Sequence, residues 1–250
     1  MQLVYLVACR VPSGKGASRL KVSFWFVVIA SLFVTCLITA NIIAVKLILL
    51  FGFLVPAGII VFPLSYLFGD VLTEVYGYAA ARQVIWLGFL CNLLAVIAFF
   101  LGGLAPAAPF WHDQAAYATI LGFTPRLLLA SFVAYLVGEF TNSFVLAKLK
   151  IATRGRWLWT RTIGSTLVGE GLDTLIFISI AFWGIIPAQL MLTAILTQWT
   201  FKVVYEVVAT PLTYLIVGLL KRREDLDTYD DRTNFNPLRL RSEAPIKEPV

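Results

Sequence analysis

Long apolar stretches constrain the fold of this chain more than any other feature of its sequence. A helix of roughly 20 apolar residues can cross a hydrocarbon core of about 30 Å while satisfying its own backbone hydrogen bonds. Six stretches fit that description, at residues 23–50, 54–72, 79–104, 126–147, 162–186 and 190–220. The sequence therefore predicts an all-α membrane protein with six transmembrane helices.

Composition agrees, because 60% of the residues are hydrophobic and only 14% are charged. So little polar surface cannot coat a water-soluble globule of this size. Six spans with short connections occupy most of the chain, which predicts one transport domain over residues 23–220 and leaves no room for a soluble catalytic domain.

Basic residues predict the orientation, because cytoplasmic connections are enriched in Lys and Arg. They precede the first stretch, follow the second, fourth and sixth, and are absent from 51–55 and 187–189. This alternation predicts that both termini are cytoplasmic, with residues 1–22 forming an N-terminal segment. Residues 221–250 mix acids, bases and prolines, which predicts a disordered cytoplasmic tail.

Several function classes are excluded. The net charge of +6 comes from Lys and Arg clusters beside apolar runs, which indicates topology rather than nucleic-acid binding. The three cysteines lack CxxC spacing and His112 is the only histidine, so we expect no metal site and no cofactor. His112 has no nucleophile beside it, so we expect no catalytic residues and no enzyme.

Ionisable residues in or at the edge of the apolar stretches are the informative positions, since a lipid-facing charge costs several kcal/mol. They are Asp70, Glu74, Glu139, Glu170, Asp173 and Glu206, against Lys46, Arg82 and Lys202. Gln198, Lys202 and Glu206 recur every four residues, so they share one helix face and Lys202 can neutralise Glu206. That pair serves either packing or function.

Two further pairs are spaced three residues apart, Glu139 with Asn142 and Glu170 with Asp173, so each pair should point inward from one helix face. Lys46 is the one base that can reach Glu139, Glu170 and Asp173, so these buried acids carry an excess of negative charge. They must take up protons or accept a ligand rich in N–H donors, such as a guanine-like edge, on which a carboxylate accepts two hydrogen bonds. The alternative is salt bridging to the basic fourth connection, which suits Asp70 and Glu74 best.

The second stretch is interrupted by Pro56, Gly58 and Pro63, which either line a cavity with freed carbonyls or simply kink a helix. Asn41 can contact a ligand or a neighbouring helix equally well.

Local patterns resemble the queuosine precursor transporter family over residues 23–220. They are Ala40-Asn41 with Lys46; Phe62-Pro63, Ser65-Tyr66, Asp70, Glu74, Tyr76-Gly77 and Arg82; Gly138-Glu139 with Asn142; Arg161, Ser165, Gly169-Glu170 and Asp173; and Lys202, Glu206 and Pro211. The resemblance implies a six-helix bundle like the substrate-binding S components of energy-coupling-factor vitamin transporters. It also implies action on 7-deazaguanine precursors, the 7-cyano and 7-aminomethyl forms.

The leading hypothesis is therefore a multi-pass importer of these precursors in the bacterial inner membrane. Glu139, Glu170 and Asp173 would bind the base edge, with Asn41, Asn142, Gln198 and Lys202 orienting it and Phe62, Tyr66 and Trp199 stacking on the ring. A gating and structural network would comprise Lys46, Asp70, Glu74, Arg82 and Glu206. No phosphate-binding loop is present, so any ATPase module would be a separate partner. A homo-oligomer stays open.

Rival hypotheses remain. Phe68-Gly69-Asp70 is weakly similar to the Gly-Asp motif of intramembrane aspartyl hydrolases, but no second Gly-Asp occurs in another stretch. An importer of a different small polar metabolite or vitamin fits the same acids. A non-transporting scaffold would leave them unexplained.

Overall fold

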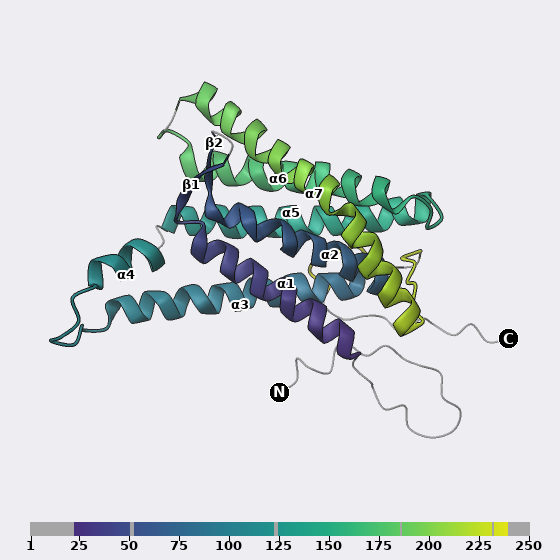
Figure 1. Ribbon diagram of the computed structural model, residues 1–250, viewed down its shortest axis with the longest axis horizontal. Coiled ribbons are helices and arrows are strands. Elements are labelled where there is room, and N and C mark those ends of the chain that lie inside the picture. Colours follow the sequence, from purple (N-terminus) through teal and green to yellow (C-terminus); the bar gives the residue numbers. More distant parts are fainter. Residues whose placement is uncertain (1–22, 51–52, 123–124, 186, 232, 240–250) are drawn as a thin grey trace, which may run out of the picture.

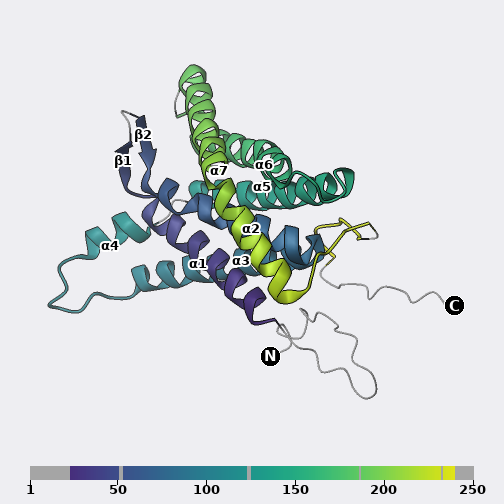
Figure 2. The same cartoon turned by 45° about the vertical axis from the view of Figure 1, so that its right-hand side comes forward.

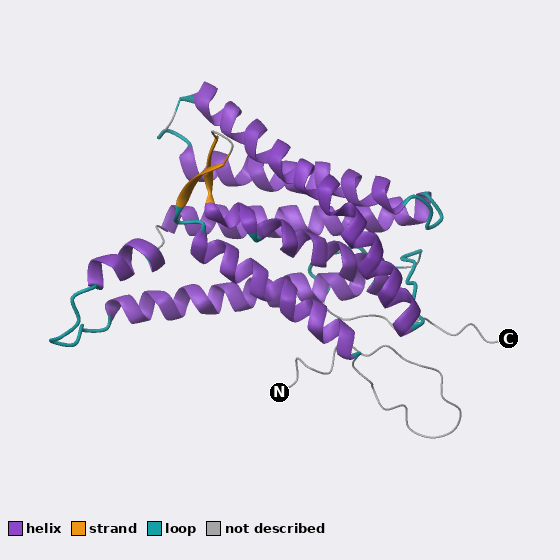
Figure 3. Cartoon of the chain, viewed as in Figure 1, coloured by secondary structure: helices purple, strands orange, loops and turns teal. Residues whose placement is uncertain are grey.

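The computed structural model describes residues 23–50, 53–122, 125–185, 187–231 and 233–239. The chain forms a bundle of long helices with one short hairpin at one end (Figures 1 and 3). In order, the elements are α1 (Phe24–Ile43), β1 (Leu47–Leu50), β2 (Phe53–Pro56), the 3-10 turn η2 (Ala57–Ile60), α2 (Phe62–Tyr76), α3 (Tyr78–Leu104), α4 (Gln114–Leu121), α5 (Pro125–Ala152), α6 (Leu158–Phe182) and α7 (Ala188–Glu224). The N-terminal segment 1–22 lies outside the described residues.

Five helical segments in the described part of the chain are long and apolar enough to cross a membrane: α1, α3, α5 together with α4, α6 and α7. The chain is thus a multi-pass membrane protein. The second expected span, residues 54–72, differs, because α2 has 15 residues. At 1.5 Å per residue it reaches only about 22 Å, short of the roughly 30 Å of a hydrocarbon core.

The expected boundaries of the first two spans are wrong. Helix α1 ends at Ile43 rather than near residue 50, and the next residues pair as an antiparallel hairpin with Leu47 opposite Pro56. Residues 54–61 form β2 and η2 instead of helix. Prolines explain the second change, because Pro56 cannot donate within a helix, whereas Pro63 is tolerated in the first turn of α2.

The turn η2 is tightly packed on α1. A Cβ added at Gly58 would lie 2.8 Å from the carbonyl oxygen of Ala40, so only glycine fits there. Farther along the same face, α1 packs on α2, with the rings and methyls of Phe33, Leu37, Leu67 and Val71 forming part of the core. Helix α2 is thereby held in the middle of the bundle, and 12 of its 15 residues are buried.

Helices α5 and α6 run side by side, as Figures 1 and 2 show. Small residues permit this approach: a Cβ at Gly169 would lie 2.6 Å from the Cβ of Asn142, and one at Gly138 would lie 2.7 Å from the Cβ of Asp173. Close backbone contact at small residues is the usual way that helices associate in lipid. It brings the polar faces of α5 and α6 together.

The expected disordered tail is wrong for residues 221–231 and 233–239. Helix α7 continues to Glu224, and the residues after it fold back on the bundle; we call 225–231 with 233–239 the C-terminal strap. The side chain of Asp230 accepts a hydrogen bond from the backbone N–H of Tyr78 at 2.9 Å. Arg82 donates to the carbonyl oxygens of Asn234 (2.8 Å) and Asn236 (2.7 Å).

Composition missed this strap because hydrogen bonds and one ring hold it, rather than a run of apolar residues. Phe235 packs against Tyr78 and Phe144, with ring centroids 5.0 and 5.2 Å apart. Residues 240–250, the rest of the expected tail, lie outside the described residues.

Candidate functional site

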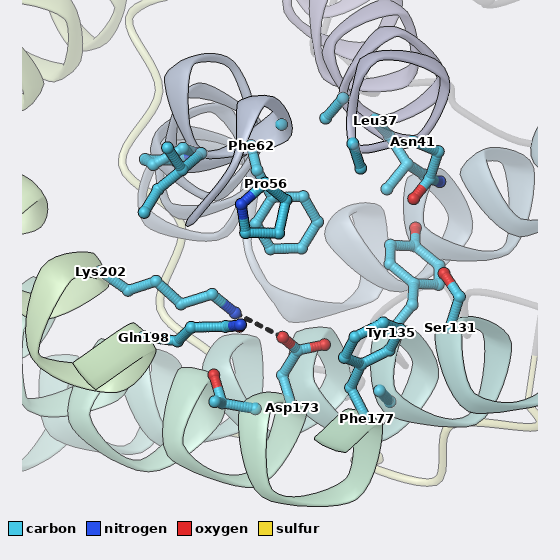
Figure 4. A pocket seen from close by; sticks show the side chains of 17 residues that line it. Leu37, Asn41, Pro56, Phe62, Ser131, Tyr135, Asp173, Phe177, Gln198 and Lys202 are labelled. Atoms are coloured by element: carbon cyan, nitrogen blue, oxygen red, sulfur yellow. Dashed lines mark hydrogen bonds and ion pairs between the residues drawn. The ribbon is translucent and has the colours of Figure 1, made fainter. Parts of the chain in front are cut away.

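A cavity of about 130 Å³ opens among α1, η2, α2, α5, α6 and α7. That is roughly ten times the 10–15 Å³ that one buried water needs. Its polar wall consists of Asn41, Ser131, Tyr135, Asp173, Thr174, Gln198 and Lys202, and Leu37, Pro56, Phe62 and Phe177 are among its apolar residues. Figure 4 shows both kinds of side chain around the space, with Phe62 opposite Asp173 and with Phe177 beside Asp173. A mostly apolar wall with a few convergent polar groups is typical of a small-molecule site.

Lys202 is the charged centre of the site. Its ammonium lies 2.6 Å from Oε2 of Glu170 and 2.5 Å from Oδ2 of Asp173 (Figure 4 draws the contact with Asp173). The expected pairing of Lys202 with Glu206 is therefore wrong. Four-residue spacing placed both on one face of α7, but α6 supplies two acids nearer to the ammonium.

The rings of α2 lie under this ammonium. Lys202 Nζ is 4.8 Å from the ring centroid of Phe62 and 5.9 Å from that of Tyr66, which are cation–π distances. Phe62 lines the cavity, whereas Tyr66 is 1% exposed and lies behind Phe62 with ring centroids 5.3 Å apart.

The two carboxyl pairs both face inward, since Glu139, Asn142, Glu170 and Asp173 are all buried. Only Asp173 of these four lines the cavity. Glu139 packs beside Gly69 of α2, where a Cβ would lie 3.2 Å from Glu139 Oε2, and Asn142 Nδ2 donates to Asp70 Oδ1 at 2.6 Å. The cavity thus contains fewer acids than the sequence suggested.

Asn41 and Gln198 both line the cavity. Asn41 was expected to contact either a ligand or a neighbouring helix. It lines the cavity, and its Nδ2 also donates to Oδ1 of Asn92 on the neighbouring helix α3 at 3.2 Å. Trp199 does not line the cavity: its indole N–H donates to the carbonyl oxygen of Leu167 at 3.1 Å, and the ring covers Gly171. It faces away from the space in which a base would stack.

Sequence reasoning missed Ser131, Tyr135 and Phe177. Tyr135 donates its hydroxyl to the carbonyl oxygen of Ile85 at 2.9 Å and presents its ring to the cavity. A signal was available: Tyr135 lies one helical turn before Glu139, and Phe177 one turn after Asp173, so both share a face with an inward acid.

The expected gating network divides into separate contacts. Lys46 has an exposed side chain beside the hairpin, where its carbonyl oxygen accepts from Ala57 N at 2.7 Å. Arg82 holds the strap, as described above, and Glu206 has no ion pair in the described part of the chain. Glu74 alone lies in an ion-pair cluster.

This cluster ties five parts of the chain together. Glu74 Oε1 lies 2.8 Å from Arg161, 2.7 Å from Lys221 and 3.6 Å from Lys150. Asp227 of the strap lies 2.6 Å from Lys150 and 2.9 Å from Lys221. We call Glu74, Lys150, Arg161, Lys221 and Asp227 the basic-end cluster.

The cations of this cluster govern Asp227. Partial burial alone would raise its pKa, but hydrogen bonds from Lys150 and Lys221 outweigh burial and lower the pKa below its ordinary value. Asp227 therefore stays ionised at neutral pH and fixes the strap to α5 and α7. Among the described residues no group of three His, Cys, Asp or Glu side chains can hold a metal ion.

Comparisons with known proteins show the family of the chain. Residues 56–216 match the family described as putative vitamin uptake transporter. A probable queuosine precursor transporter of Bacillus subtilis (strain 168) is 34% identical over 190 residues, which cover 75% of this chain and 82% of the relative. The queuosine precursor transporter of Escherichia coli (strain K12) is 30% identical over 214 residues, covering 82% and 90%. No solved structure gives a significant match.

Proposed function

The chain belongs to the queuosine precursor transporter family, and on that premise we propose that it imports a 7-deazaguanine precursor, the 7-cyano or 7-aminomethyl form, across the bacterial inner membrane. Its relatives are named transporters, so it moves a small molecule rather than transforming one. The proposal includes an S-component-like bundle with both termini and the basic-end cluster in the cytoplasm, in keeping with the enrichment of Lys and Arg there.

The observation that carries this proposal is the pairing of Asp173 and Lys202 in the cavity wall. A guanine-type edge presents two N–H donors and a carbonyl acceptor in a row. The carboxylate of Asp173 can accept the ring N–H and the exocyclic amine, and the ammonium of Lys202 can donate to the carbonyl oxygen. One Asp–Lys pair thus complements the whole edge.

Aromatic rings complete the site. Phe62 and Phe177 lie on different helices that border the cavity, and Tyr135 adds a third ring (Figure 4). A flat heterocycle can stack between such surfaces while its edge reaches Asp173 and Lys202. Glu170, bonded to Lys202 from behind the wall, positions that ammonium, while Asn41 and Gln198 are placed to contact the remaining polar atoms.

The test is uptake in cells that cannot synthesise deazaguanines, scored by queuosine in their tRNA with the base supplied at low concentration. Expression of this chain should restore the modification. Asp173→Asn and Glu170→Gln should each weaken uptake strongly, because losing one charge-assisted hydrogen bond of about 1.5–3 kcal/mol lowers affinity roughly 10- to 150-fold.

The matched control is Asp225→Asn, the same chemical change at an exposed position on the strap. All variants are compared at equal membrane abundance. If the unaltered chain fails to restore queuosine, the substrate assignment is wrong. If it succeeds and both acid variants match the control, the assignment of the cavity is wrong.

A further inference from the structure

Ionisable side chains occupy three levels along the bundle. Lys202, Glu170 and Asp173 form the level at the cavity, and the basic-end cluster forms the level at the other end. Between them lie Asp70, Glu139 and Glu206, which we call the middle acids. On α2, Tyr66, Asp70 and Glu74 follow at four-residue steps of about 6 Å, so Asp70 lies one turn from each outer level.

The middle acids are buried at 1%, 0% and 2% exposure for Asp70, Glu139 and Glu206, and none forms an ion pair within the described residues. Their free oxygens have no hydrogen-bond donor: Oδ2 of Asp70, both oxygens of Glu139 and Oε1 of Glu206. Of the helices that carry them, α2 packs against both α5 and α7.

Asn142 is an independent sign that this level has too few hydrogen-bond donors. It is completely buried, its Nδ2 donates to Asp70 Oδ1, and its own Oδ1 has no donor. A buried amide oxygen without a donor costs about 1–3 kcal/mol. The middle level therefore contains several buried acceptor oxygens without hydrogen-bond donors. The hydroxyl of Tyr66, which also has no partner, is one available donor.

The surroundings cannot neutralise the middle acids. The titratable groups that interact with them are Tyr66 and Glu74 of α2, Tyr135 of α5, Glu170 and Asp173 of α6, and Lys202 and Tyr205 of α7, while Cys36 of α1 interacts with Tyr205. Lys202 is the one base in that set, and Glu170 and Asp173 already share it. The cations beyond Glu74 are likewise held by Glu74 and Asp227.

We propose that the middle acids are a proton-binding site that couples import of the base to inward movement of protons. This rests on the proposed function. A proton converts a carboxylate into a carboxylic acid, which removes a buried charge and supplies the O–H donor that a neighbouring carboxyl oxygen or Asn142 Oδ1 lacks. Glu139 is the middle acid that interacts with the cavity level, and Asp70 is the one that interacts with Glu74.

The proton enters from the cavity, binds as O–H on Glu139 or on the Asp70 and Glu206 pair, and leaves as H⁺ at the basic end, restoring the carboxylate. No other bond changes. Glu206 interacts with Asp70 across the contact of α7 with α2, so rearrangement of that contact changes the surroundings of both carboxyls.

The experiment uses the full chain in proteoliposomes with radiolabelled 7-cyano-7-deazaguanine, which is neutral, and with the membrane potential clamped by potassium and valinomycin. Exchange of labelled for unlabelled base without a gradient reports the proposed function. Accumulation under a one-unit pH gradient, acid outside, reports the coupling, and one proton per base raises it up to about tenfold.

We expect Asp70→Asn and Glu206→Gln to lose the gradient-driven accumulation while exchange of the base is still detected, and Asp225→Asn to retain both. Should one variant fail to reach the membrane, the other gives the answer.

Three results would overturn the inference. If the unaltered chain exchanges the base but ignores the pH gradient, coupling is absent and the proposed function stands. If a sodium gradient drives accumulation instead, the acids bind a metal cation. If the unaltered chain exchanges no base, the proposed function itself fails.

Discussion

Replacing Glu74 by glutamine should destabilise the protein more than any other single carboxyl-to-amide change at the basic end. Glu74 is fully buried, and its Oε1 lies within 4 Å of Arg161, Lys221 and Lys150. Glutamine keeps the size and one acceptor oxygen but removes the charge. Asp227 would then be the only acid left beside three cations of the cluster.

Removing one partner of a buried ion pair costs about 3–5 kcal/mol, because the other charge stays buried and uncompensated. At about 2–4 °C per kcal/mol for a chain of this size, the midpoint of thermal unfolding should fall by roughly 6–20 °C. Removing a cation at the same time should recover part of the loss, so Glu74→Gln with Arg161→Met should be more stable than the sum of the two single changes predicts.

The assay is thermal unfolding of purified protein in one detergent, followed by size-exclusion of the remaining monodisperse fraction. Asp225→Asn is the matched control, since it makes the same chemical change outside the cluster. A midpoint for Glu74→Gln within the scatter of that control would show that the cations find other partners and that our account of the cluster is wrong.

Two further predictions concern packing and the strap. Gly169→Ala should lower the free energy of unfolding by about 1–3 kcal/mol through overpacking, because its Cβ would lie 2.9 Å from the Cα of Asn142. Gly218→Ala, where a Cβ would have no atom within 4 Å, should instead raise it by about 1 kcal/mol through helix propensity. Equal midpoints of thermal unfolding in detergent would refute the contact of Gly169 with Asn142. Asp230→Ala should cost about 0.5–2 kcal/mol by uncapping α3 and should speed proteolysis after residue 224, whereas exposed Asp231→Ala should change neither.

Long apolar stretches predicted most of the helices, because in lipid a long apolar run has few alternatives to a helix. The prediction failed between α1 and α2, where apolar residues do not form a helix. Residues 47–50 and 54–61 are apolar enough to belong to the two expected helices, yet they form strands β1 and β2 and the 3-10 turn η2, where Pro56 disfavours a helix and Gly58 approaches α1 closely. Composition does not report such a close approach of two backbones.

For the site, single-helix spacing predicted correctly that Glu139, Glu170 and Asp173 face inward, but not which partner each would meet. Lys202 was assigned to Glu206 because both lie on α7, whereas its partners come from α6. Contacts between helices depend on crossing geometry, which is set here by glycines such as Gly138 and Gly169. The strap was missed for a related reason, since it is held by donors of the bundle, the backbone N–H of Tyr78 and the guanidinium of Arg82.

The number of ion-pair partners distinguishes the charges that stabilise the fold from those proposed to bind substrate. In the basic-end cluster every acid has two or more cations, so parting any one pair leaves the others in place. At the cavity the ratio is reversed, because Lys202 has two acids. In the proposed site, a substrate edge can therefore replace the ammonium of Lys202 as the partner of Asp173 while that ammonium stays paired, since Glu170 remains 2.6 Å from it. Stranding a buried charge would cost several kcal/mol, and this second acid removes most of that penalty from binding.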